Sequence, residues 1–206
     1  MKIITLILGM TATNCYIVYD ENTKEAMIID PGDAGKRIMA EVEKNQLQVK
    51  YILNTHGHAD HIGANKYVKE ATGAELLIHA EDAEMLTEPS LNLSVYFGEP
   101  ITGPAADRVL QEGETIKVGS LEFKVLHTPG HTKGGICLVC GDVVFSGDTL
   151  FQYSIGRTDF PGGSYQQLIN SIKTKLMPLD DKIVVYSGHG PQTTIGAERR
   201  GNPFLG

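Results

Sequence analysis

The chain has 206 residues, which suits one domain over residues 1–206, and its 41% hydrophobic and 21% charged residues are typical of soluble globular proteins rather than disordered ones. Its formal net charge of -7 argues against a nucleic-acid partner, because phosphate backbones are normally bound by a basic face. No run reaches the roughly 18 apolar residues of a membrane span, and the three cysteines fit a reducing compartment, so we expect a cytoplasmic protein without a membrane partner.

The first part of the chain alternates between strand and helix signals. Its opening run, residues 2–8, is short and lacks a small-x-small cleavage site, so we expect a strand there and not a secretory signal. The expected elements then follow in the order strand, strand, helix and strand: residues 14–20, residues 25–30, a helical face of Ile38, Met39 and Val42, and residues 49–53.

Three imidazoles and one carboxylate follow the strand at 49–53 within six residues. His56 and His58 lie two residues apart, so both rings can face the same side of an extended chain, whereas Asp60 and His61 lie where a helical pattern begins. A polar loop that caps a helix would not require four such residues in this order. We therefore expect the two pairs to hold two metal ions side by side.

The middle of the chain contains a long segment without periodicity. Residues 87–106 include three prolines and two glycines and predict an irregular loop, and loops of this length are usually functional. Regular elements are expected on either side of it: a helix marked by Ala64, Val68 and Ala71 that ends at Gly73, a strand over 75–78, a short helical piece from Glu81, and strands over 115–118 and 121–126.

The order of elements in the first part recurs near the end of the chain. Strands over 136–140 and 143–146 form a hairpin at Gly141-Asp142, a helix begins at Ser164, and a strand over 183–186 precedes His189. Two halves that each cover a sheet with helices pack sheet against sheet. The sequence thus predicts an α/β fold, a four-layer αββα sandwich with two pseudo-symmetric halves.

Three glycine-rich turns after strands add further metal-capable side chains. His131 lies in residues 128–132, Asp148 in residues 146–150 and His189 in residues 187–190. Strand ends along one edge of an α/β sheet form the usual ligand crevice, so we expect these turns to meet the first motif.

The His-x-His-x-Asp-His segment at 56–61 and the three later turns resemble the signature of the metallo-β-lactamase superfamily of hydrolases, whose fold is of this four-layer kind. The resemblance implies one metal ion bound by His56, His58 and His131, a second bound by Asp60, His61 and His189, and Asp148 as the ligand that bridges both. Zinc is the metal we expect, and iron or manganese would accept the same nitrogen and oxygen donors.

The charges of such a site favour hydrolysis. Two divalent ions contribute four positive charges, of which Asp60, Asp148 and a bridging hydroxide cancel three. A water shared by two cations ionises near neutral pH, and the second ion stabilises the developing oxyanion, so no Ser or Cys nucleophile is needed. Asp60 could orient the attacking water. The expected reaction is hydrolysis of an ester, thioester, lactam or phosphodiester.

Segments outside the ligand motifs narrow the resemblance to the compact bacterial branch of glyoxalase II-like proteins. They are residues 147–151, 156–163, 188–191 and 201–205, and the likeness covers essentially the whole chain. It implies hydrolysis of S-D-lactoylglutathione or a related small-molecule thioester. Longer glyoxalase II enzymes carry an extra C-terminal helical region that holds glutathione, whereas only 17 residues follow His189 here.

Two residues are candidates for substrate binding. Arg157 could hold a substrate carboxylate or pair with Asp159, and Tyr153 is a second candidate contact. We expect His79 and His127 to be structural or to support the ligands.

Two further positions are expected to have no direct part in catalysis. Asp30 follows its hairpin in the first half as Asp148 follows its hairpin in the second. We expect Asp30 to support a ligand histidine. Cys137 and Cys140 lie three apart in a strand, so they should face opposite sides and pack in the core.

Other functions remain open at this point. The motif also resembles that of persulfide dioxygenases. These enzymes use one iron, whose ligands here would be His56 or His58, His131 and Asp148. A lactonase, lactamase or phosphodiesterase of the superfamily would use the two-metal site, although the commonest class B lactamases have cysteine where this chain has Asp148. A metal-dependent binding module would lack catalysis. The oligomeric state is left open.

Overall fold

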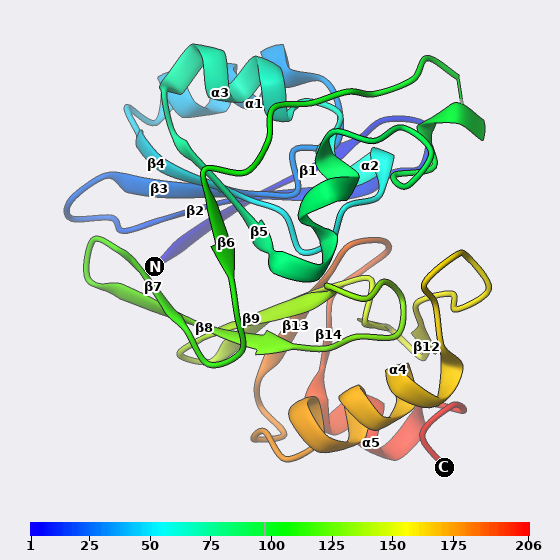
Figure 1. The fold of residues 1–206 in the computed structure, drawn as a ribbon. Helices are drawn as coiled ribbons and strands as arrows, with labels where there is room; N and C mark the ends of the chain where they lie inside the picture. Colours follow the sequence, from blue (N-terminus) through cyan, green and yellow to red (C-terminus); the bar gives the residue numbers. More distant parts are fainter. Residues whose placement is uncertain (97) are drawn as a thin grey trace.

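The structure is a computed structural model that describes residues 1–96 and 98–206. Two six-stranded sheets pack face to face, and helices cover their outer faces (Figure 1). The predicted αββα sandwich is confirmed. In spatial order the first sheet contains β1 (Lys2–Leu8), β2 (Thr13–Tyr19), β3 (Glu25–Ile29), β4 (Gln48–Leu53), β5 (Glu75–His79) and β6 (Arg108–Leu110). The second contains β14 (Thr193–Thr194), β13 (Val184–Ser187), β10 (Val143–Gly147), β9 (Ile136–Cys140), β8 (Leu121–His127) and β7 (Thr115–Val118).

The helices occupy the two outer layers. In Figure 1, α1 (Gly35–Lys44) and α3 (Asn65–Thr72) lie beyond the first sheet, and α4 (Tyr165–Ser171) and α5 (Ile195–Gly201) lie beyond the second. The short helix α2 (Ala59–Ile62), the 3-10 helices η1 (Ala80–Leu86) and η2 (Ser94–Tyr96), the π-helical continuation η3 (Ile172–Leu176) and the two-stranded ribbon β11 (Leu150–Phe151) and β12 (Ser154–Ile155) complete the fold. No helix in the described parts of the chain is both long and apolar enough to span a bilayer.

The two halves repeat one pattern of strand pairing. In the first half β2 and β3 are antiparallel, α1 follows, and β4 returns parallel to β3. In the second half β9 and β10 are antiparallel, α4 follows, and β13 returns parallel to β10. Parallel neighbours end at the same edge of a sheet. Each half therefore brings the turn after its hairpin and the turn after its returning strand to one place.

Apolar residues fill three layers between the sheets and helices. Met27 and Ile29 of β3 point into the layer between the sheets, together with Phe145, whereas Ile28 points toward α1 and α3. Strands that are buried on both faces are apolar at almost every position, which explains the unbroken hydrophobic run in β3. Burial of each such side chain contributes about 1.5–3 kcal/mol.

The two clustered cysteines confirm the expected strand geometry. Cys137 packs against α4 residues in the outer layer, and Cys140 packs in the layer between the sheets. Both are buried free thiols.

The sequence-based prediction missed the short elements. It did not include β6, the ribbon β11–β12, β14 or α5. Within the predicted loop 87–106 the structure adds η2, and Phe97 lies outside the described residues. Ser164 does cap α4, because its hydroxyl accepts a hydrogen bond from the backbone N–H of Gln167 at 3.4 Å.

One buried carboxylate joins the two sheets away from the metal-capable residues. Asp20, at the end of β2, accepts hydrogen bonds at 2.7 Å from both the backbone N–H and the hydroxyl of Ser120, in the turn between β7 and β8. It also accepts one from the backbone N–H of Asn22 at 2.8 Å. These bonds, those from Ser120 first, hold the pKa of Asp20 well below its usual range.

We expect Asp20→Ala to lower the urea concentration at the midpoint of unfolding at pH 7. A depressed carboxyl pKa contributes stability above the unfolded-state value of about 4, and this contribution is lost as the pH falls through the folded-state value. The difference between variant and wild type should therefore shrink between pH 5 and pH 3, followed by fluorescence or circular dichroism. Glu21→Ala, which removes an exposed ion pair with Lys2, is the control; equal midpoints at pH 7 would contradict the assignment.

Candidate metal centre

The turn after β4 carries the first group of metal-capable side chains. His56 and His58 are buried, and α2 begins directly after His58, whose backbone is extended. Asn54 fixes this turn because its side-chain amide donates to the carbonyl oxygen of His61 at 3.0 Å and to Asn65 at 3.3 Å. The strand end thus presents histidines two residues apart, and the helix adds the next two side chains.

One cluster combines the turn after β4 with the turn after β8. The ring nitrogens of His56, His58 and His131 lie within 4.8 Å of one another, and all three side chains are buried. The Nδ1 atom of His58 is 2.9 Å from the Nε2 atom of His131. Residues 73 positions apart in the chain therefore share one small space.

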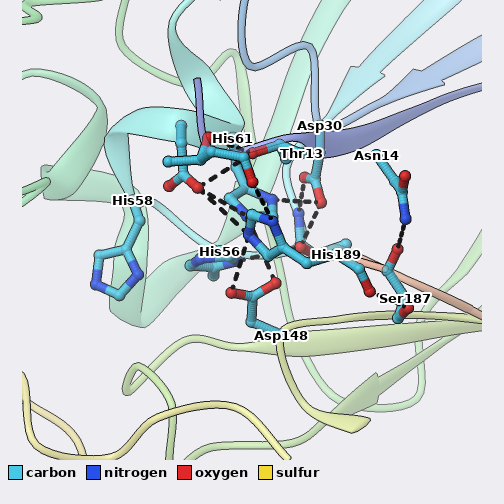
Figure 2. A network of polar contacts seen from close by, with 12 residues as sticks. Thr13, Asn14, Asp30, His56, His58, His61, Asp148, Ser187 and His189 are labelled. Atoms are coloured by element: carbon cyan, nitrogen blue, oxygen red, sulfur yellow. Dashed lines mark hydrogen bonds and ion pairs between the residues drawn. The ribbon is translucent and has the colours of Figure 1, made fainter. Parts of the chain in front are cut away.

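A second cluster combines α2 with the turn after β13 (Figure 2). Figure 2 shows His61 beside His189. Asp60, His61 and His189 place one donor atom each within 4.8 Å of the others. The Nε2 atom of His189 is 3.3 Å from both the Nε2 atom of His61 and the Oδ2 atom of Asp60.

Asp148 lies in the turn after β10, and its carboxylate approaches the imidazoles of His61 and His189 (Figure 2). Its Oδ2 atom is 3.5 Å from the Nε2 atom of His131 in the first cluster and 3.5 Å from that of His189 in the second. Its Oδ1 atom is 3.5 Å from the Nε2 atom of His61. One carboxylate therefore contacts imidazoles of both clusters.

The donor atoms fit metal ions. His56 Nε2 and Asp148 Oδ1 are buried and have no hydrogen-bond partner in the described parts of the chain, a condition that costs about 1–3 kcal/mol per group when nothing compensates it. The shorter separations between donor atoms, 2.9–3.8 Å, bracket the roughly 3.3 Å between neighbouring ligands of a tetrahedral zinc ion. These seven side chains can hold two metal ions.

The pKa values of the cluster indicate a position prepared for positive charge. Burial and the neighbouring His131 lower the pKa of His58 to about 3, so its imidazole is a neutral donor. Burial also opposes the charged form of His61, but Asp148, Asp30 and Asp60 overcome it and raise its pKa to about 10. Asp60 remains ionised, because His61 and His189 hold its pKa well below the usual range against the effect of burial. Positive charge at the position of His61 is therefore stabilised by three carboxylates, those of Asp30, Asp60 and Asp148.

Comparison with known proteins agrees with this geometry. The family model described as the Metallo-beta-lactamase superfamily matches residues 8–189. The chain belongs to the metallo-beta-lactamase superfamily. It is a hydrolase of that superfamily and binds divalent metal through His and Asp side chains.

Three relatives of this superfamily member are similar over nearly their whole length. Hydroxyacylglutathione hydrolase GloC of Haemophilus influenzae is 45% identical over 196 residues, which are 93% of this chain and 92% of GloC. The crystal structure of BLEG-1 B3 metallo-beta-lactamase has a TM-score of 0.95 at 41% identity and covers 99% of both chains. The structure of TTHA1623 in a di-iron-bound form has a TM-score of 0.88 at 35% identity and covers 98% of this chain and all of that one.

In this metallo-beta-lactamase fold, three histidine rings are oriented by hydrogen bonds that their Nδ1 atoms donate. His61 donates through Nδ1 to Asp30 at 2.9 Å, His131 to the carbonyl oxygen of Arg157 at 2.8 Å, and His189 to that of Thr11 at 3.1 Å. Each bond turns the Nε2 atom of the ring toward the cluster, as is usual for metal-binding histidines.

Asp30 supports the cluster as expected from the sequence. Its carboxylate also accepts hydrogen bonds at 2.7 Å from the backbone N–H and the hydroxyl of Thr55. Glycine is required at position 188, next to the cluster, because a Cβ atom there would overlap Asp148 and His61.

Sequence reasoning missed Asp82 of η1, whose side chain is 1% exposed. It accepts hydrogen bonds from the backbone N–H of Gly57 at 3.2 Å, the hydroxyl of Thr132 at 2.6 Å and the backbone N–H of Gly134 at 2.7 Å. Gly57 separates His56 from His58, and Thr132 follows His131. One carboxylate therefore ties together both turns of the first cluster. An acidic residue in a short helical piece gives no sequence signal for such a role.

The candidate substrate contacts lie in different surroundings. A cavity of about 580 Å³ opens above the clusters, and Arg157 lines it. Arg157 pairs with Asp159 through two bonds of 2.8 Å. Tyr153 is 52% exposed, and its ring lies against Gly201 of α5, outside the residues that line the cavity. His79 and His127 stack on each other with ring centroids 4.0 Å apart and belong to neither metal cluster.

We expect Asp82→Asn to reduce the free energy of unfolding by about 1–3 kcal/mol, because an NH2 group replaces one carboxylate oxygen and at least one buried donor loses its acceptor. It should also weaken metal retention by roughly tenfold or more, since both turns of the first cluster loosen. Competition with a chromogenic chelator measures the second effect. Glu84→Gln makes the same chemical change at an exposed position of η1 and should leave retention unchanged. If both variants retain metal like the wild type, Asp82 does not hold the turns.

Proposed function

We propose that the protein is a two-metal hydrolase of thioesters, with S-D-lactoylglutathione or a related thioester as substrate. In this proposal His56, His58 and His131 bind one ion, Asp60, His61 and His189 bind the other, and Asp148 bridges them. The position of Asp148 carries the proposal, because its two oxygens lie 3.5 Å from imidazoles of both clusters. A site for one ion would not require a carboxylate shared in this way.

The chemistry follows from the donors that surround the ions. Two bound divalent ions would lower the pKa of a water molecule between them and polarise the carbonyl oxygen of a substrate. Asp60 contributes an ionised carboxylate that the hydroxyl of Thr13 holds at 3.1 Å. Asp60 lines the cavity, and in this proposal its carboxylate accepts a hydrogen bond from the attacking water. Hydrogen bonds from Nδ1 of His61, His131 and His189 keep these rings oriented toward the cluster.

Thioester cleavage is supported by the similarity to hydroxyacylglutathione hydrolase GloC at 45% identity over most of both chains. Zinc is the metal we propose, since it accepts this mixture of imidazole and carboxylate without a geometric preference of its own. The di-iron form of a relative with 35% identity makes iron the main alternative.

A second candidate function is lactam hydrolysis. It is favoured by the likeness to BLEG-1 B3 metallo-beta-lactamase, which extends over 99% of both chains. The two activities use the same attack on a carbonyl carbon, so they differ in which substrate the cavity accepts. A persulfide dioxygenase would need one iron with three ligands, which leaves the cluster of Asp60, His61 and His189 without a function.

We expect the purified protein to contain about two metal ions per chain and to hydrolyse thioesters, measured by elemental analysis and by thiol release. His58→Ala should abolish turnover and reduce the metal content, because it removes a donor from the first cluster, while the fold persists by circular dichroism. His127→Ala removes a histidine outside the clusters and should keep both properties.

Three outcomes would count against the proposal. A fully active His58→Ala variant would contradict the ligand assignment. Faster turnover of β-lactams than of any thioester would favour the lactamase. One iron per chain together with oxygen uptake on glutathione persulfide would favour the dioxygenase.

A further inference from the structure

Apolar side chains flank both metal clusters in the cavity. Phe160 lies edge-on to His58 with ring centroids 5.8 Å apart, and Phe151 lies edge-on to His189 at 6.1 Å. Further apolar lining comes from Met10, Ala59, Leu93 and Ile155. Met10 is 98% exposed at the rim. A carbonyl carbon above the clusters would therefore have apolar surface on each side.

The polar side chains of the lining are mostly engaged within the protein. The amide of Asn92 donates at 2.9 Å to two backbone carbonyl oxygens, and its own oxygen accepts from the backbone N–H of Ser94. The hydroxyl of Thr11 lies 2.9 Å from that of Thr13. These groups hold the loops that form the walls, and they leave few hydrogen bonds for a ligand.

Arg157 is the one Lys or Arg among the described residues that line the cavity, and it is also engaged. Its guanidinium forms two bonds of 2.8 Å with Asp159 and lies 3.7 Å from the centroid of the Phe160 ring. A substrate carboxylate would have to compete with Asp159 for the guanidinium, which already has a bidentate partner in the preferred geometry. In this arrangement Arg157 supports the Phe160 wall.

We infer that the cavity binds the carbon atoms on both sides of the thioester carbonyl through apolar contacts, and that it does not recognise the carboxylates of glutathione. This inference rests on the proposed thioester hydrolysis. A glutathione thioester carries two carboxylates, and in this cavity they remain in solvent. The recognised part of the substrate is then the acyl group and the carbon atoms next to the sulfur.

The first test compares S-D-lactoylglutathione with its diethyl ester, which lacks both carboxylate charges. A recognised carboxylate contributes about tenfold or more to kcat/KM, because hydrogen bonds to charged groups are worth about 1.5–3 kcal/mol. We expect the diethyl ester to be hydrolysed with a kcat/KM equal to that of the parent or higher. A kcat/KM at least about tenfold lower for the diethyl ester would overturn the inference.

The same pair of substrates tests Arg157. We expect Arg157→Gln to change kcat/KM by the same factor for both, since the side chain acts through Phe160. A loss confined to the charged substrate would show that Arg157 binds a carboxylate, which contradicts the inference.

The second test varies the acyl group at constant thiol. Acetyl, butanoyl and hexanoyl thioesters of N-acetylcysteamine should show a rise in kcat/KM of up to about fourfold per CH2 group, the value of one buried methylene. Ile155→Ser should reduce this rise, because it makes one lining position polar. Val109→Ser, at an exposed position of the edge strand β6, is the matched control and should keep the rise.

The outcomes separate the inference from the function on which it rests. Turnover of glutathione thioesters with no effect of acyl length overturns the inference and leaves the thioester hydrolase intact. No turnover of any thioester by the metal-loaded protein overturns both.

Discussion

The constraint that organises the molecule is a buried group of carboxylates and imidazoles that favours positive charge between the two halves. Asp30, Asp60 and Asp148 lie among five imidazoles at the junction of the two halves, and burial of a carboxylate is costly unless positive charge or hydrogen-bond donors compensate it. The raised pKa of His61 shows how strongly this place favours positive charge. Since the complete set of donors exists only in the folded chain, metal binding contributes directly to folding stability.

The repeated strand pattern explains why such distant residues meet. In each half the returning strand is parallel to the hairpin strand, so an aspartate and a histidine arrive at one sheet edge: Asp30 with His56, and Asp148 with His189. The aspartates of the two halves have different roles. Asp30 stays behind His61 as a hydrogen-bond acceptor, whereas Asp148 enters the space between the clusters. Bound ions would therefore link the two halves to each other as well as to a substrate.

The sequence predicts the sandwich and the seven clustered side chains, because long apolar strands and closely spaced histidines leave strong local signals. It predicts the support from Asp30 but not that from Asp82, and it misses β6, the ribbon β11–β12, β14 and α5. Asp82 resembles any acidic residue of a short helix, and its role arises from N–H groups that lie 25 and 52 residues away in the chain. The packing of α5 on the ribbon β11–β12 is similar: the buried Glu198 accepts from the backbone N–H of Tyr153 at 2.9 Å, a contact that no periodicity indicates.

The metal-capable side chains and the residues that line the cavity come from different parts of the fold. The metal-capable side chains come from strand ends and from α2, which packed sheets hold in place. The walls of the cavity come from the turn after β1, from the loop around Leu93 and from the segment between Phe151 and Phe160. Loops accept substitution more readily than strands do. Relatives with identities of 45% and 41% carry names as different as hydroxyacylglutathione hydrolase and B3 metallo-beta-lactamase. In this chain, a substitution in the walls would alter the shape and polarity of the cavity without moving the donors.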